Sequence, residues 1–211
     1  KESLPDATHL ALGFDSRAGL SKGTAKTAIE SAGKGSGVRI DGRLTSEKLG
    51  SRTRRIDFGA GEKLAVSIPW GDVSTAYYTT GIPNIEVYTA SSQKSVDGMR
   101  RANLVRPLLR QRWVRELVKF SAQRRITPPD KTQRDNNPTH LWGEARNAAG
   151  EVRTARLRTA NGYSLTVHAA LGILDVVLNR ACNPGFSTPS FLVGADFVST
   201  LPGSSTIRID S

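Results

Sequence analysis

The stretch that decides the fold reads WGDVSTAYYTTGIPNIEVYTA and runs from Trp70 to Ala90. An apolar strand precedes it, and Asp72 is placed to cap a short helix over residues 73–78. Gly81 closes that helix, and residues 85–90 have the composition of a further strand. A strand, a short helix and a strand in this order favour a mixed sheet with a crossover.

Strands and one helix are also predicted upstream of this stretch. The short apolar run at residues 8–13 predicts a buried strand. Ser21 stands where the N-cap of a helix over residues 24–31 would be. Three strand-like stretches follow, at residues 38–44, 54–58 and 63–68. The first alternates, with Val38, Ile40 and Gly42 expected on one face, which is typical of a sheet with one wet side.

Helices, a loop and a hairpin are predicted downstream. Residues 95–121 have helical periodicity, but Pro107 should break or restart the helix near Arg106, giving two helices or a kinked one. The polar, proline-rich residues 126–138 predict a loop. The remaining predicted elements are a β-hairpin at 139–147 and 152–159, a long helix at 163–179 with Leu165, Ala169, Leu171 or Gly172, Val176 and Leu178 inward, a short helix at 190–194 and a strand at 206–209.

This order of elements predicts an α+β fold with a mixed, largely antiparallel sheet covered by helices. We expect one domain over residues 1–211, with the basic helical region 95–125 and the loop 126–138 as an insertion. The single cysteine, Cys182, excludes an internal disulfide and a cysteine-based zinc site. No apolar run in the sequence reads as a membrane span, because charged residues or histidine interrupt the longest ones. These features predict a cytoplasmic protein.

The net charge of +11 is concentrated in one region. Residues 100–125 hold nine Lys or Arg and a single acid, Glu116. A solvated helical face is one interpretation. The alternative is a basic module that docks on nucleic acid or an anionic membrane through this region. Trp113 and Phe120 are predicted on the core face, which disfavours a stacking platform for single strands and makes nucleic acid or membrane the weaker prediction.

Common catalytic and cofactor motifs are not found in the sequence. The glycines at 33–37 and 59–61 lack the G-x-G-x-x-G spacing at a strand-to-helix turn, so they predict turns rather than a dinucleotide site. The three histidines are scattered without metal-ligand spacing, so no metal site is predicted. No G-x-S-x-G nucleophile elbow is present, which disfavours a hydrolase of that kind.

Two loops carry residues suited to ligand binding. Phe14–Ser16 follow a buried strand and lead to Ser21–Thr24 at a helix start, where free backbone N–H groups favour an anionic group. A capped helix with a polar turn explains the same residues. In the second loop, Trp70 and Asp72 precede Tyr78, and an aromatic wall with a carboxylate could line a pocket. A core tryptophan and a capping aspartate are the structural alternative.

The same loops resemble a known family, the saccharopine dehydrogenase-like oxidoreductases. The resemblance is carried by GFDS at 13–16, SKGT at 21–24, SIPWGDVSTAYYTTGIPNIEVYTA at 67–90, GYSLTVHAAL at 162–171 and TPSFLVGADFVSTLPG at 188–203. It implies a two-domain protein in which an N-terminal Rossmann domain binds NAD(P). The C-terminal α+β domain of that family resembles the second domain of glyceraldehyde-3-phosphate dehydrogenase-like folds, supplies the substrate side and forms a homodimer.

The resemblance leads us to expect that this chain, which begins at Lys1, is the C-terminal domain alone. By itself it should neither bind the dinucleotide tightly nor transfer hydride, and its small-molecule substrate is not indicated. By residue type, the candidates for handling a proton are Asp15, Tyr78 and Tyr163. The candidate substrate-binding residues are Phe14, Ser16, Ser21, Thr24, Trp70 and Asp72.

Overall fold

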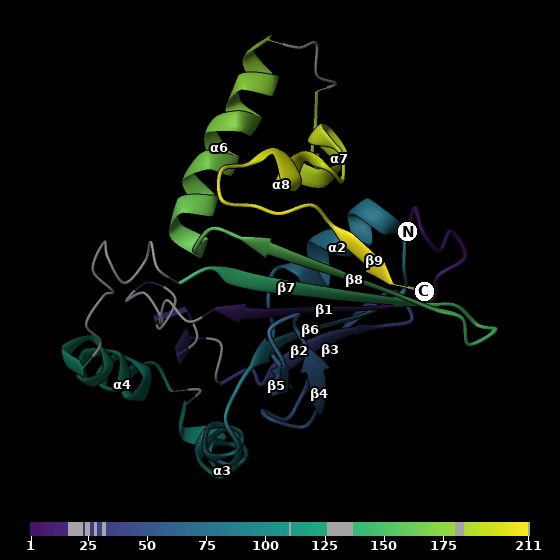
Figure 1. The fold of residues 1–211 in the computed structure, drawn as a ribbon. Coiled ribbons are helices and arrows are strands. Elements are labelled where there is room, and N and C mark those ends of the chain that lie inside the picture. Colours follow the sequence, from purple (N-terminus) through teal and green to yellow (C-terminus); the bar gives the residue numbers. More distant parts are fainter. Residues whose placement is uncertain are drawn as a thin grey trace.

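The computed structural model of the chain describes residues 1–16, 23, 26–27, 29–30, 33–109, 111–125, 137–179 and 184–210. These residues form an α+β fold: one open, mixed and mostly antiparallel sheet of nine strands, with six helices around it (Figure 1). Ser21, Thr24, most of the predicted helix over 24–31 and the loop 126–136 lie outside the described residues.

The centre of the sheet is strand β1. Its neighbours are β6 on one side, which runs parallel to it, and β7 on the other, which is antiparallel. The sheet continues from β7 through β8 to β9. The bounds of these strands are His9–Ser16 for β1, Asn84–Ala90 for β6, Thr139–Arg146 for β7, Val152–Thr159 for β8 and Arg208–Asp210 for β9. The predicted strand after the central helix and the predicted β7–β8 hairpin are therefore confirmed.

Beyond β6 the sheet divides into two hairpins. These are β2 (Ser36–Ile40) with β3 (Arg43–Glu47), and β4 (Thr53–Asp57) with β5 (Glu62–Ser67). The single strand predicted at 38–44 is wrong, because the chain turns back at Asp41 and Gly42. Their φ angles of 47° and 77° are both left-handed, as a two-residue hairpin turn requires, and Asp-Gly is a preferred pair for it.

The two faces of the sheet have different covers. On the face that carries Ala11, Tyr88 and Trp142, the β4–β5 hairpin packs Ile56 and Phe58 into a buried cluster, so we call this the hairpin face. On the opposite face, Leu10 packs beside Leu4, Ala7, Ile82 and Ala145, close to helix α2, so we call this the helix face. Side chains alternate between the two faces along each strand.

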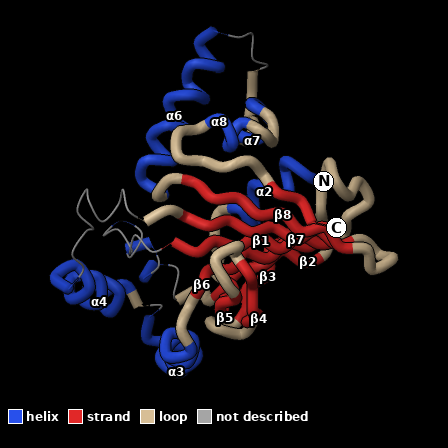
Figure 2. The backbone as a smooth tube through the Cα atoms, in the orientation of Figure 1, coloured by secondary structure: helices blue, strands red, loops and turns tan. Residues whose placement is uncertain are grey.

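Helix α2 (Asp72–Thr80) connects β5 to β6, as the sequence predicts (Figure 2). Its N-cap is Gly71, with no side-chain cap hydrogen bond, so the prediction that Asp72 caps the helix is wrong. Arg39 of β2 fastens the helix to the sheet. Its Nε donates to the Val73 carbonyl at 3.0 Å, and its guanidinium lies 4.2 Å from the centre of the Tyr77 ring.

Helix α6 (Gly162–Asn179) stands away from the sheet together with α7 (Pro189–Val193) and α8 (Phe197–Thr200) (Figure 1). None of its residues is buried, so the predicted inward positions of Leu171 and Leu178 are wrong: both side chains are exposed. Within the described part of the chain, α6 is the one helix long and apolar enough to cross a membrane by length and composition. The prediction that no apolar run is long enough to span a membrane is therefore wrong for residues 162–179.

Helices α3 (Gln93–Leu109) and α4 (Arg112–Arg125) lie at the other end of the molecule from α6 (Figure 1). The prediction was two helices or a kinked one, and the structure has two, but the predicted break near Arg106 is wrong. Helix α3 runs through Pro107 and ends two residues later, at Leu109. Trp113 and Phe120 are exposed rather than in the core, so their predicted placement is also wrong.

Candidate functional site

Two predicted site residues, Phe14 and Asp15, lie at the carboxyl end of β1. Phe14 and Asp15 are neighbours on a strand, so their side chains point to opposite faces of the sheet. Phe14 lies on the helix face, opposite Thr89 of β6 and Leu141 of β7. Asp15 lies on the hairpin face, opposite His140. Each residue therefore belongs to a different environment, although the sequence suggests a single loop.

Asp15 is held by an ion pair under the β4–β5 hairpin. The residue is only 4% exposed, and Lys63 of β5 donates to its Oδ2 at 2.5 Å. A carboxylate so deeply buried needs this cation, because an unpaired buried charge is costly. The pair fixes Asp15 in place and leaves it little access to solvent.

Phe14 and Trp70 are brought together on the helix face. Their ring centres are 5.5 Å apart and the rings are tilted by 51°. The two residues are separated by more than fifty positions in the sequence, and they come from the two predicted ligand loops. Trp70 remains partly exposed, so the pair forms an apolar wall that solvent reaches.

A second aromatic pair lies toward the carboxyl end of α2. The Tyr78 ring meets Phe186 edge-on at 5.3 Å, and both residues are exposed. Thr79 Oγ1 lies 2.7 Å from Thr188 Oγ1 and 3.3 Å from Ser190 Oγ. These contacts hold the segment that leads into α7 against α2.

Asp72 lies at the start of α2, next to the Trp70 wall, and is half-buried. Burial raises the pKa of Asp72 above its ordinary value, against the opposing effect of a hydrogen bond from its own backbone N–H. A half-buried carboxyl whose neutral form is favoured can hold a proton at a pH where an exposed aspartate would have lost it. Asp72 is therefore a better candidate for proton handling than its predicted role in substrate binding suggests.

Tyr163 lies in the first turn of α6. Its backbone N–H donates to Asn161 Oδ1 at 3.1 Å, and Asn161 serves as the cap of the helix. Ser16 is exposed at the end of β1, whereas Ser21 and Thr24 lie outside the described residues. Asp15 lies in β1, Tyr78 in α2 and Tyr163 in α6. Their catalytic roles stay predictions.

A network of charges on the hairpin face was not predicted from the sequence. Arg54 binds Glu144 with two hydrogen bonds of 2.8 and 3.1 Å and lies 4.7 Å from the Trp142 ring centre. Arg52 bridges Glu86 and Glu47. Burial lowers the pKa of Arg54, but the hydrogen bond to Glu144 and the charges of Glu144, Tyr88 and Glu86 together outweigh it, so the pKa is raised.

Tyr88 joins this network by donating its hydroxyl proton to Glu86. Burial, followed by that hydrogen bond, raises the pKa of Tyr88 and keeps the phenol neutral. The available signal in the sequence was the spacing of two residues between Arg52, just before β4, and Arg54 within it. The partners of these arginines, Glu86 and Glu144, lie on β6 and β7, and the pairing follows only from the order of the strands.

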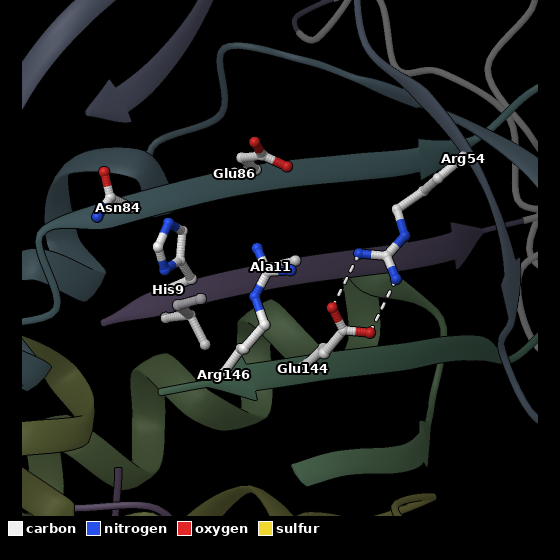
Figure 3. A pocket seen from close by; sticks show the side chains of 8 residues that line it. His9, Ala11, Arg54, Asn84, Glu86, Glu144 and Arg146 are labelled. Atoms are coloured by element: carbon white, nitrogen blue, oxygen red, sulfur yellow. Dashed lines mark hydrogen bonds and ion pairs between the residues drawn. The ribbon is translucent and has the colours of Figure 1, made fainter. Parts of the chain in front are cut away.

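A small hollow opens beside this network at the amino end of β1 (Figure 3). It measures about 60 Å³ and is lined by His9, Leu10, Ala11, Arg54, Asn84, Glu86, Glu144 and Arg146. Ligand pockets for drug-sized molecules are roughly 300–1,000 Å³, so the hollow is too small for a dinucleotide. No cluster of three or more metal-ligating side chains is found among the described residues.

The site that the geometry favours is the aromatic pair on the helix face, made by Phe14 and Trp70, with Asp72 two residues along the chain from Trp70. We call it the aromatic wall. In comparisons with known proteins, no family model matches the chain and no curated protein matches it.

Proposed function

We propose that the chain is the C-terminal, substrate-side and dimerisation domain of a saccharopine dehydrogenase-like NAD(P)-dependent oxidoreductase. The observation that carries the proposal is the convergence of the resembling segments. Residues 13–16 and 67–90 meet at the Phe14–Trp70 contact, and residues 67–90 and 188–203 meet at Thr79 and Thr188. The first contact lies before the start of α2 and the second lies in its last turn, so the segment 67–90 joins the other two segments.

In this proposal a Rossmann domain of the same protein binds the dinucleotide. The sequence has no phosphate-cradling G-x-G-x-x-G, and the hollow on the hairpin face is too small for such a ligand. A reduced nicotinamide would supply a hydride to the substrate. The aromatic wall would hold the substrate against it and exclude water, which a hydride transfer requires.

The proton that accompanies the hydride would come from this chain. Asp72 is the first candidate, because burial favours its protonated form and it lies beside Trp70. Tyr78, toward the carboxyl end of α2, is the second, because its phenol is exposed. Asp15 is the weakest of the predicted groups, because Lys63 already holds its carboxylate on the opposite face.

The exposed apolar surface of α6 supports a contact with another domain or subunit. Val167, Leu171 and Leu174 are all more than half exposed, together with Leu178. An exposed apolar patch of this kind usually marks an interaction site. A homodimer or the Rossmann domain would cover it.

The proposal is tested by titrating NADH and NADPH into the chain alone and into its mixture with the Rossmann domain that the same gene encodes. The chain alone is expected to bind neither cofactor, and the mixture to bind one of them. Leu171→Glu should weaken assembly, and Leu44→Glu on the distant strand β3 is the matched control. Cofactor binding by the chain alone, or a mixture that never assembles, would count against the proposal.

A further inference from the structure

Helices α3 and α4 expose apolar side chains at the end of the molecule opposite α6 (Figure 1). The exposed fractions are 84% for Leu104, 57% for Leu108, 69% for Trp113, 62% for Leu117 and 54% for Phe120. Leu104 and Leu108 are one helical turn apart, and so are Trp113, Leu117 and Phe120, so each set lies on one side of its helix. We call these five residues the α3–α4 apolar surface.

The polar side chains of α3 attach it to the rest of the molecule. Asn103 accepts from the Leu49 N–H at 3.0 Å and donates to the Leu49 carbonyl at 2.9 Å. Arg100 donates to the Gly50 carbonyl at 3.0 Å, and Arg106 to the Lys34 carbonyl at 2.9 Å.

On α4, too, a polar side chain faces the rest of the molecule while apolar side chains face solvent. Lys119 is 8% exposed, and it pairs with Glu30 at 2.6 Å and Glu116 at 2.9 Å. A helix on the surface of a water-soluble domain normally turns its apolar stripe inward and its charges outward. Here leucines and aromatic residues point outward while a lysine is buried, so the outward side is suited to an apolar environment.

The net charge of this region bears on the choice of partner. Residues 100–125 hold nine Lys or Arg and one acid, Glu116, a net charge of +8. Arg100, Arg106 and Lys119 bond inward, whereas Arg101 and Arg112 are exposed. Two copies joined through this surface would bring two such regions together, which electrostatic repulsion opposes. Nucleic acid would satisfy the charge but offers no place for Leu104, Leu108 and Leu117, because base recognition relies on stacking and hydrogen bonds.

We infer that the α3–α4 apolar surface docks the protein on an anionic lipid membrane. Helices of this kind lie in the plane of the interface, with leucine and aromatic side chains among the acyl chains and basic residues at the lipid headgroups. The anionic leaflet of a cytoplasmic membrane supplies the opposite charge. Docking there leaves α6 at the opposite end of the molecule from the membrane (Figure 1).

The test is sedimentation of the whole chain with vesicles of phosphatidylcholine alone or with added phosphatidylserine. Binding is expected only to the anionic vesicles, and it should weaken as salt is raised. Trp113→Ala with Leu117→Ala should lower the partition coefficient by about tenfold or more, because two large apolar side chains no longer leave water. Phe186→Ala, which removes an exposed aromatic side chain far from α4, should bind as the wild type does.

A second pair of variants separates charge from insertion. Arg101→Gln with Arg112→Gln should weaken binding at low salt, whereas Arg55→Gln with Arg208→Gln removes two exposed charges elsewhere and should have little effect. Trp113→Phe should keep most of the binding but lose quenching of tryptophan fluorescence by brominated lipid. Thermal melts show that each variant is folded.

Three results would overturn the inference. The first is no binding to anionic vesicles at low salt. The second is undiminished vesicle binding by the Trp113→Ala and Leu117→Ala variant. The third is binding to an oligonucleotide, or self-association, that these substitutions abolish while vesicle binding is absent.

Discussion

At the residue scale, the buried pair of Asp15 and Lys63 sets a clear expectation for stability. Lys63→Met leaves the Asp15 carboxylate buried without its cation. Unfolding free energy should fall by roughly 3 kcal/mol, as for other broken buried pairs. Adding Asp15→Asn should recover part of the loss, since the unpaired charge is gone. Urea unfolding of both variants measures this, and an unchanged midpoint for Lys63→Met would show that the pair is not needed.

Asp72 gives a prediction with a definite sign. Its pKa is raised in the folded protein, so the ionised carboxylate is less stable there than in the unfolded chain. This cost is absent below the unfolded pKa of about 4 and is fully present above the folded value. Asp72→Asn should therefore raise the melting temperature at pH 7, and the gain should shrink as the pH approaches 4. A variant less stable than the wild type at pH 7 would contradict the environment described for Asp72.

At the scale of elements, two glycines form a matched pair. Gly42 has a left-handed φ of 77° in the β2–β3 turn, whereas Gly98 lies inside α3 with nothing within 4 Å of an added Cβ. Gly42→Ala should cost about 1 kcal/mol or more, and Gly98→Ala should stabilise by about 0.5–1 kcal/mol. Thermal melts of the two variants give opposite shifts if the turn and helix are correct. Equal shifts would show that the hairpin turn is misplaced.

Local patterns in the sequence predicted several elements correctly. The strand at 85–90, the β7–β8 hairpin and the helix before Gly81 follow from alternation, turn residues and glycine punctuation. The β2–β3 hairpin was missed, because Asp41 and Gly42 fit the alternation of one long strand as well as they fit a turn.

Contacts between distant segments were harder to predict. Pairing of Arg54 with Glu144 depends on the order of strands, which no local pattern reveals. The apolar periodicity of α6 and α4 predicted helices that pack in the core. Their apolar side chains are exposed instead, because burial depends on which other elements pack against a helix. Of the candidate site, the sequence indicated both Phe14 and Trp70, but not that Asp15 lies on the opposite face.

At the scale of the whole molecule, α6 is expected to serve assembly rather than the stability of this domain. Leu171→Glu with Leu174→Glu should change the unfolding free energy by less than about 0.5 kcal/mol, as is usual for exposed positions. The same variant should fail to assemble with a second copy or with the Rossmann domain in light scattering. A loss of several kcal/mol (measured by urea unfolding) would instead make α6 part of the domain's own core.

The aromatic wall as one side of a reductase site is the central claim. It is tested most directly by steady-state reduction in an assembly of this chain with the Rossmann domain that we propose for the same protein. The assay adds small unsaturated or carbonyl compounds one at a time as candidate substrates. It follows the decrease in NAD(P)H absorbance. The account predicts turnover by the assembly, and a fall in kcat/KM of about tenfold or more for Trp70→Ala, since it removes apolar contact with bound substrate. Leu44→Ala, at an exposed leucine on β3, should leave kcat/KM unchanged. Equal activity of the Trp70→Ala assembly and the wild type would contradict the claim.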